Sequence, residues 1–148
     1  MTDKTSQRSG ELFDSGFWCA ESVLLAVAES KGIESDLIPK IASGFCAGIS
    51  RTNQLCGALS GAIMAINLLY GRSKPDESMD KNRFLVQEMI EMFKDKFGST
   101  NCRELTGCDL ETEEGYKLYY SNNLNIKCRN FVTEAVSMAI LLIEQGEF

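Results

Sequence analysis

The chain has 148 residues, with 15 lysines and arginines against 21 aspartates and glutamates, and its formal charge is −6. It contains six cysteines and no histidine. Without imidazole, the protein has no Ser-His or Cys-His nucleophilic pair, no histidine zinc ligand and no histidine-ligated haem. A C-x-x-C-H string for covalent haem attachment is also missing, so we expect no haem cofactor. The acidic composition likewise predicts that the protein does not bind nucleic acid.

Length and hydropathy predict a single helical domain over residues 1–148. Residues 1–10 are polar and are expected to form a flexible N-terminus without the apolar core of a signal peptide. The longest apolar run, Leu55–Tyr70, is interrupted by polar residues and is shorter than the ~20 residues that span a membrane. We therefore expect no membrane insertion and a cytoplasmic location, where cysteines are more often metal-binding or redox-active than disulfide-bonded.

Apolar side chains recur at three- and four-residue steps, which is the period of core-facing helices, and no segment shows the alternation of a β-strand. Gly71 and Gly98 follow two of these stretches and are expected to end helices. In chain order we expect helices over Trp18–Ser30, from Asp36 past Pro39, and over Gln54–Tyr70, Met79–Phe97, Asn101–Thr106, Leu110–Tyr120 and Ile126–Gln145, with a glycine-containing loop over Ser43–Asn53. The pattern predicts an all-α, single-domain helical bundle of four or five main helices.

Four of the six cysteines fall near predicted helix starts: Cys19, Cys56, Cys102 and Cys128. Helix N-termini carry unpaired N–H groups and a partial positive charge, which lower the pKa of a thiol and favour the thiolate. Arg103, Lys127 and Arg129 flank two of these cysteines and would act in the same direction. Because the thiolate is both the nucleophile and the metal ligand, these positions indicate a cysteine-based site. The alternative is that the cysteines are small buried hydrophobic residues.

The spacing of the cysteines leaves the chemistry open. No C-x-x-C pair occurs, so a thioredoxin-like motif and a zinc ribbon are unsupported, and the close spacing of ferredoxin cysteines is also missing. Any shared site is therefore assembled by folding, as cofactor sites between the facing helices of a bundle are. Gly57 and Gly61 share a helical face beside Cys56. They indicate either close packing of a neighbouring helix or room for a bulky group such as a cluster or second sulfur.

Several segments together resemble one protein family. They are Phe17–Leu25 around Cys19, Ala42–Phe45, Arg51–Thr52, the Cys56-Gly-Ala-x-x-Gly61 motif, Phe97–Asp109 with two cysteines, and Cys128. Over roughly Phe13–Ile143 the chain is similar to the C_GCAxxG_C_C family, which implies a small helical protein with redox-active cysteines. That family looks similar to the non-haem portion of split-Soret cytochromes, which implies an iron–sulfur centre without the haem-binding part.

The resemblance also assigns individual cysteines. It places the motif cysteines on Cys19, Cys56, Cys128 and one or both of Cys102 and Cys108. Cys46 lies in a segment that the family usually fills with glycine, and the resemblance therefore makes it a bystander.

The leading hypothesis is a cysteine-based redox-active or electron-transfer protein that holds an iron–sulfur cluster or another thiolate-bound metal. Its metal ligands would be Cys56, Cys102, Cys108 and Cys128, and Cys19 would be a ligand or a nearby redox thiol. One alternative is a metal-free thiol/disulfide oxidoreductase, and another is a non-catalytic helical interaction protein with structural cysteines. Whether the protein is an enzyme and which redox partner it meets stay open, and a homodimer is compatible with a helical domain of this size.

Overall fold

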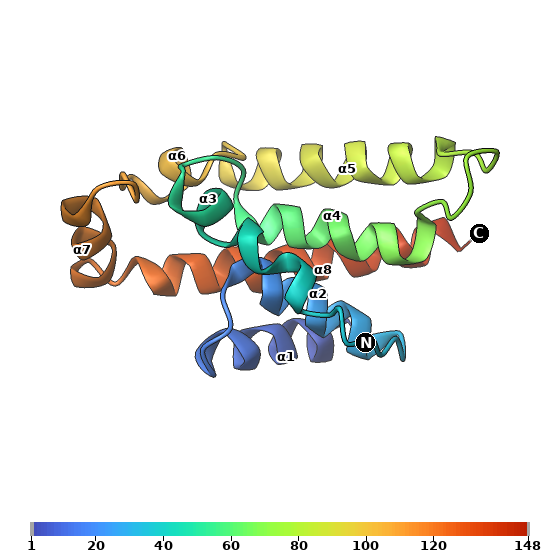
Figure 1. Ribbon diagram of the computed structural model, residues 1–148, viewed down its shortest axis with the longest axis horizontal. Helices are drawn as coiled ribbons and strands as arrows, with labels where there is room; N and C mark the ends of the chain where they lie inside the picture. Colours follow the sequence, from blue (N-terminus) through green and yellow to red (C-terminus); the bar gives the residue numbers. More distant parts are fainter. Residues whose placement is uncertain (1, 148) are drawn as a thin grey trace.

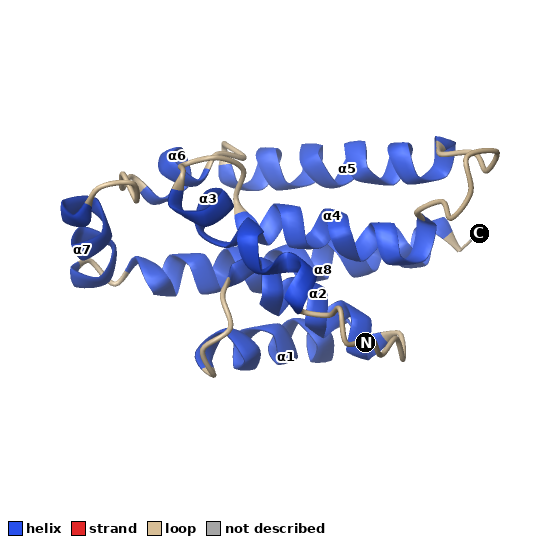
Figure 2. Cartoon of the chain, in the orientation of Figure 1, coloured by secondary structure: helices blue, strands red, loops and turns tan. Residues whose placement is uncertain are grey.

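Helices make up nearly all of the regular structure in the computed structural model, which describes residues 2–147 (Figures 1 and 2). These residues form eight α-helices and one 3₁₀-helix, and their only β-structure is an isolated bridge between Leu55 and Asn101. The all-α prediction is confirmed, but the helices are more numerous than the four or five expected. They are α1 (Thr2–Asp14), α2 (Cys19–Ser30), η1 (Lys40–Phe45), α3 (Cys46–Arg51), α4 (Gly57–Tyr70), α5 (Asp80–Phe97), α6 (Cys102–Thr106), α7 (Glu113–Ser121) and α8 (Leu124–Gly146).

The additional helices are short connecting elements. The helix expected from Asp36 begins only at Lys40 and is the 3₁₀-helix η1, while the expected loop over Ser43–Asn53 contains the six-residue α3. These segments contain too few apolar repeats for periodicity to reveal them. The long helices α2, α4, α5 and α8 agree with prediction to within three residues at each end.

The N-terminal residues differ from expectation because they pack against the end of the chain. Residues 2–10, expected to be a flexible tail, lie in α1, which packs along α8. Ser6 Oγ donates to the carbonyl oxygen of Thr133 at 3.0 Å. Gly10 is buried, and a Cβ there would lie 2.6 Å from the guanidinium of Arg129. Glycine thus allows α1 to approach a large side chain on α8, a contact that local sequence does not predict.

The core is built around α8, which packs against α1, α2, α4 and α5. The largest fully buried side chains of the core include Leu24, Leu59, Ile66, Phe93 and Ile143. The helices α2 and α4 approach closely because α4 presents small residues to α2. Burial of the apolar stripes of these helices stabilises the bundle by about 25 cal/mol for each Å² removed from water.

The two ends of the bundle are built differently (Figure 1). At one end, α3, α6 and α7 gather beside the first turns of α4 and α8, and the long connection between α4 and α5 lies at the other end. We call the first the cysteine end, because the chain's cysteines lie there: Cys19, Cys46, Cys56, Cys102, Cys108 and Cys128. None of the described helices is long and apolar enough to cross a membrane.

Candidate functional site

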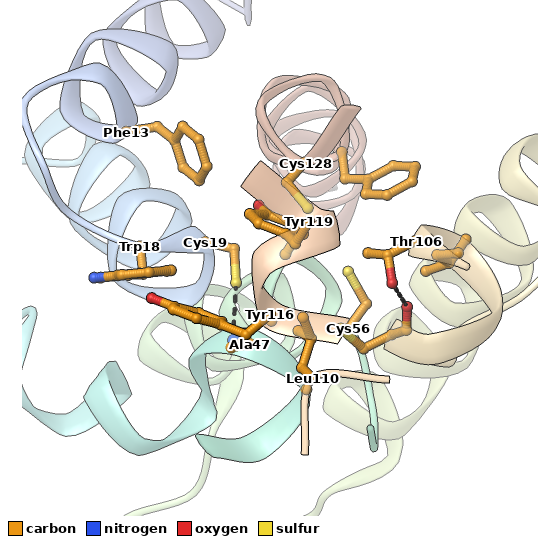
Figure 3. Close-up of a pocket in the computed structure, with 16 residues that line it drawn as sticks. Phe13, Trp18, Cys19, Ala47, Cys56, Thr106, Leu110, Tyr116, Tyr119 and Cys128 are labelled. Atoms are coloured by element: carbon orange, nitrogen blue, oxygen red, sulfur yellow. Dashed lines mark hydrogen bonds between the residues drawn. The ribbon is translucent and has the colours of Figure 1, made fainter. Parts of the chain in front are cut away.

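A small cavity lies at the cysteine end. Four thiols line it, those of Cys19, Cys56, Cys102 and Cys128. The rest of the wall is mostly apolar and includes Phe13, Trp18, Tyr116, Tyr119 and Phe131. About 30 Å³ is open to the centres of water-sized molecules, which exceeds the roughly 10–15 Å³ that one buried water needs. Figure 3 shows the sulfurs of Cys56 and Cys128 pointing into the central space.

Each lining thiol lies at or near a helix start, as the sequence predicts. Cys19 is the first residue of α2, and Cys102 is the first residue of α6. Cys56 immediately precedes α4 as its N-terminal capping residue. Cys128 lies about one turn inside α8, which begins at Leu124. The four sulfurs therefore come from four different helices, and helix packing brings them to one cavity.

Cys108, predicted as a metal ligand, does not line the cavity with the other three predicted ligands. It is buried. It packs instead in a small cluster with Cys102, Leu110 and Tyr119. Cys46 is likewise buried and off the cavity wall. Over residues 2–147, no group of three or more cysteine, aspartate or glutamate side chains is arranged to hold a metal ion.

Burial reverses the effect that we expected helix starts to have on the thiols. It raises the pKa of Cys56 to about 12 and the pKa values of Cys102 and Cys128 to about 11. The N–H groups of Ala58 and Leu59 at the start of α4 do lower the pKa of Cys56, but desolvation is the larger effect. The expectation of a lowered pKa is therefore wrong for these three residues, which are protonated thiols at neutral pH.

Cys128 shows how the thiols affect one another. Burial is the largest cause of its raised pKa, and the charges of Cys102 and Cys108 raise it further. A hydrogen bond from Tyr119 and the positive charge of Lys127 act in the opposite direction. A negative charge on one sulfur thus makes ionisation of its neighbours less favourable. For Cys128, Tyr119 and Lys127 offset only part of this effect.

The two arginines expected to offset thiolate charge are paired with carboxylates. Arg103 lies 3.9 Å from the Asp109 carboxylate. Arg129 donates to both carboxylate oxygens of Asp14 at 2.9 Å. Lys127, also noted as a flanking residue, is the cation that lowers the pKa of Cys128. All three side chains are next to a cysteine in the sequence, so the sequence alone did not show which of them pair with carboxylates and which acts on a thiol.

Gly57 and Gly61, the two glycines beside Cys56, have different structural roles. A Cβ at Gly57 would collide with Cys19 Sγ, so this glycine makes room for a sulfur. A Cβ at Gly61 would lie 2.7 Å from the carbonyl oxygen of Ala20, so this glycine allows α4 to approach the backbone of α2. Both alternatives left open by the sequence therefore apply, each to one residue.

Most of the short element α3, residues 47–51, is a left-handed backbone turn and not a regular α-helix, and it forms part of the site. Ala47, Ile49, Ser50 and Arg51 have φ angles between 55° and 66°, although none is glycine. Such backbone costs about 1–2 kcal/mol per non-glycine residue, and strain of this kind concentrates at functional sites. The turn directs the Ala47 N–H to Cys19 Sγ at 3.5 Å (Figure 3). Sequence reasoning missed this contact, and Gly44 and Gly48 indicated only an irregular segment.

Contacts with α6 and α7 hold the left-handed turn. Arg51 Nε donates to the carbonyl oxygen of Leu110 at 3.0 Å, and its guanidinium lies 3.9 Å from the ring centre of Tyr116. On the other side, a Cβ at Gly48 would lie 2.6 Å from Cys102 Cβ. The turn therefore fits between the thiols of α2 and α6, and tertiary contacts outweigh its local strain.

Comparison with known proteins identifies a family. The family model described as "Putative redox-active protein (C_GCAxxG_C_C)" matches residues 17–141. The chain belongs to this family. A protein of Archaeoglobus fulgidus that carries the name "Uncharacterized protein" is similar, with 29% identity over 93% of this chain and 92% of its own length. No solved structure is significantly similar to the chain.

The C_GCAxxG_C_C match confirms the resemblance seen in the sequence, and the family description indicates redox activity. The resemblance left open whether Cys102 or Cys108 belongs with the other motif cysteines. Cys102 lines the cavity, whereas Cys108 does not. The structure therefore groups Cys102 with Cys19, Cys56 and Cys128.

Proposed function

We propose that the protein is a redox protein whose lining thiols hold an iron–sulfur cluster and transfer electrons through it. The ligands would be Cys19, Cys56, Cys102 and Cys128. One observation carries the proposal: four cysteines from four helices line one small, mostly apolar cavity. Four sulfur donors match the all-cysteine ligation of common iron–sulfur clusters, and the family is described as redox-active.

The donor set suits a cluster better than a single ion. Thiolates lie about 2.3 Å from a zinc ion, so ligands of one ion have sulfurs within about 4 Å of one another. The part of the chain that the structure describes contains no such group. In a cluster, different cysteines bind different irons, and their sulfurs lie further apart. A cluster therefore agrees with sulfurs that share a cavity without converging on one point.

The chain's own groups would control the chemistry of these sulfurs. The Ala47 N–H donates to the sulfur of Cys19, and the N–H groups of Ala58 and Leu59 stabilise a negative charge on Cys56. Hydrogen bonds to ligand sulfurs and low solvent exposure set the reduction potential of a cluster. The aromatic wall limits water around the ligands. A bound cluster would supply one-electron transfer.

Ligand binding would also require these buried thiols to lose their protons. The pKa values of Cys56, Cys102 and Cys128 are all raised in the folded chain. Because the thiolate is the metal ligand, metal binding displaces those protons. We therefore expect cluster assembly to release protons and to proceed further at mildly alkaline than at acidic pH.

Anaerobic reconstitution of the full-length chain with ferrous iron and sulfide tests the proposal. Iron and acid-labile sulfide are measured per chain, and the reduced protein is examined by electron paramagnetic resonance. Cys56→Ser and Cys128→Ser are expected to lose iron and sulfide. Cys108→Ser is the matched control, because that thiol is buried nearby but lies off the cavity wall.

Three outcomes contradict the proposal. In the first, the chain binds neither iron nor sulfide after reconstitution. In the second, Cys108→Ser loses as much iron as Cys56→Ser. If all cysteine substitutions change stability alone, with no change in metal content or redox behaviour, the cysteines are structural and the protein is a helical interaction module.

A further inference from the structure

A second hollow lies beside the cavity at the cysteine end. Its volume is about 180 Å³, and none of the residues that line it carries a charge. Five of them are aromatic: Phe13, Phe17, Trp18, Tyr119 and Tyr120. We call this feature the aromatic hollow. Phe13, Trp18 and Tyr119 also line the cavity, so the two spaces share a wall of three rings (Figure 3).

The rings of the aromatic hollow are open to solvent. Phe17, Trp18 and Tyr120 are 37%, 39% and 46% exposed. They come from the connection between α1 and α2 and from α7, so the fold gathers them from distant parts of the chain. Exposed apolar side chains grouped around a concave surface are typical of a binding site.

Two polar groups of the aromatic hollow are available to a ligand. Asn125 lines the hollow, and its side-chain amide makes no hydrogen bond with any residue between 2 and 147. Tyr120 Oη accepts from Tyr116 Oη at 3.5 Å, which leaves the proton of Tyr120 for another acceptor. The amide and the hydroxyl can both donate to a carbonyl oxygen.

These features fit an uncharged conjugated ring that carries carbonyl oxygens. Such rings pack against aromatic side chains in offset or edge-to-face arrangements. An apolar cavity of about 150 Å³ holds one benzene ring, so the aromatic hollow has room for one six-membered ring. We propose that the aromatic hollow binds the ring of a benzoquinone, and that this quinone accepts electrons from the cysteine site. The electron transfer rests on the proposed function, whereas the binding of the ring does not.

The electron transfer forms no bond between the protein and the ring. Two reduced clusters lose one electron each, and one quinone gains both electrons. Two protons from water bind the two quinone oxygens, and the product is the hydroquinone. Trp18 lines the aromatic hollow and directly precedes Cys19 in the chain, which places a bound ring close to a proposed ligand.

Binding is tested with duroquinone and the full-length, iron-free chain under anaerobic conditions. All ring carbons of duroquinone are substituted, so thiols do not add to its ring. Trp18 is the only tryptophan of the chain, and its fluorescence therefore reports directly on the aromatic hollow. We expect saturable quenching of this fluorescence, and one bound duroquinone per chain by equilibrium dialysis.

Substitutions at the exposed wall test the place of binding. Tyr120→Ala and Asn125→Ala should each raise the dissociation constant of duroquinone roughly twofold to tenfold, because a ring contact or a donor is lost. Tyr120→Phe should weaken binding less than Tyr120→Ala, since it keeps the ring. Phe84→Ala is the matched control, because Phe84 is 53% exposed near the start of α5, at the end away from the cysteines.

Two results overturn the binding of the ring. One is quenching that rises linearly with duroquinone and never saturates, together with no retention in dialysis. The other is a loss of binding in Phe84→Ala as large as that in Tyr120→Ala.

Stopped-flow mixing tests the electron transfer and separates the two proposals. The chain is reconstituted with iron and sulfide, reduced with dithionite, freed of excess reductant and mixed with duroquinone. The rate of reoxidation should saturate with duroquinone and should fall in Tyr120→Ala at unchanged iron content. A rate that is the same in both chains overturns the role of the quinone as acceptor. A chain that binds duroquinone but no iron contradicts the proposed function and supports the binding of the ring, whereas a chain that holds iron and sulfide but binds no duroquinone contradicts only the quinone site.

Discussion

The two ends of the bundle use the same helices for different purposes. Away from the cysteines, α4, α5 and α8 meet through fully buried side chains such as Ile66, Met89 and Ile143. The cysteine end instead contains a cavity, buried thiols and a left-handed turn at Ala47. Close packing stabilises the first end, whereas features of the second end cost free energy. The comparison suggests that the well-packed end supports a strained site.

The largest expected effect comes from the well-packed end. Ile66 is fully buried on α4, and Ile66→Ala should lower the free energy of unfolding by about 2–5 kcal/mol, because it removes apolar contacts and leaves a cavity. Urea denaturation measures the change. The iron content of the reconstituted protein should be unaffected below the unfolding transition. If the folded variant lost its iron, the two ends would not be independent.

A smaller loss of stability, with a larger loss of function, is expected where α4 meets Cys19. Gly57→Ala places a methyl group against Cys19 Sγ, and overpacking of this kind costs about 1–3 kcal/mol. The variant should also lose iron binding, because the Cys19 sulfur must move. Gly44→Ala is the control, since its nearest neighbour would be Ser50 Oγ at 3.9 Å. Equal effects of both substitutions would show that Gly57 has no special relation to the thiol.

The smallest effect is the pH dependence of the reduced, metal-free chain. The pKa values of Cys56, Cys102 and Cys128 are raised from 9.0 to about 11–12 in the folded state. Their contribution to stability is therefore fully present well below pH 9.0, begins to be lost as the pH approaches 9.0, and is lost further as the pH rises toward the folded-state values.

Between about pH 8 and 9 the three thiols together should lower the free energy of unfolding by about 1 kcal/mol. Urea denaturation at the two pH values measures this difference. Cys56→Ala should make the dependence shallower. Stability that rises with pH over this interval would mean that the thiols are ionised in the folded protein.

Sequence predicted the long helices better than the short elements. The helices α2, α4, α5 and α8 carry repeated apolar residues, and glycines follow α4 and α5 as expected. Residues 2–10 of α1 were expected to be a tail, because they are mostly polar and their helix depends on contacts with α8. The turn at Ala47 has no sequence pattern of its own, since it depends on contacts with α6 and α7.

The candidate site likewise has features that the sequence predicted and features that it did not. The sequence correctly predicted that Cys19, Cys56 and Cys102 lie at helix starts, because the start of a helix is determined by residues close together in the chain. The direction of their pKa shifts was not predictable in this way, because burial depends on residues far apart in the chain. The hydrogen bond from the Ala47 N–H to Cys19 Sγ was missed for the same reason.

The sequence by itself determined that no site in this protein uses histidine and that six cysteines are available as redox thiols or sulfur ligands. It also determined that most of those sulfurs lie near helix starts. Tertiary structure decided which sulfurs share the cavity, that Cys108 lies outside it, and that the Ala47 N–H meets Cys19. The reason is physical: a helix is specified by neighbours within a few residues, whereas the meeting of two thiols depends on the packing of whole helices.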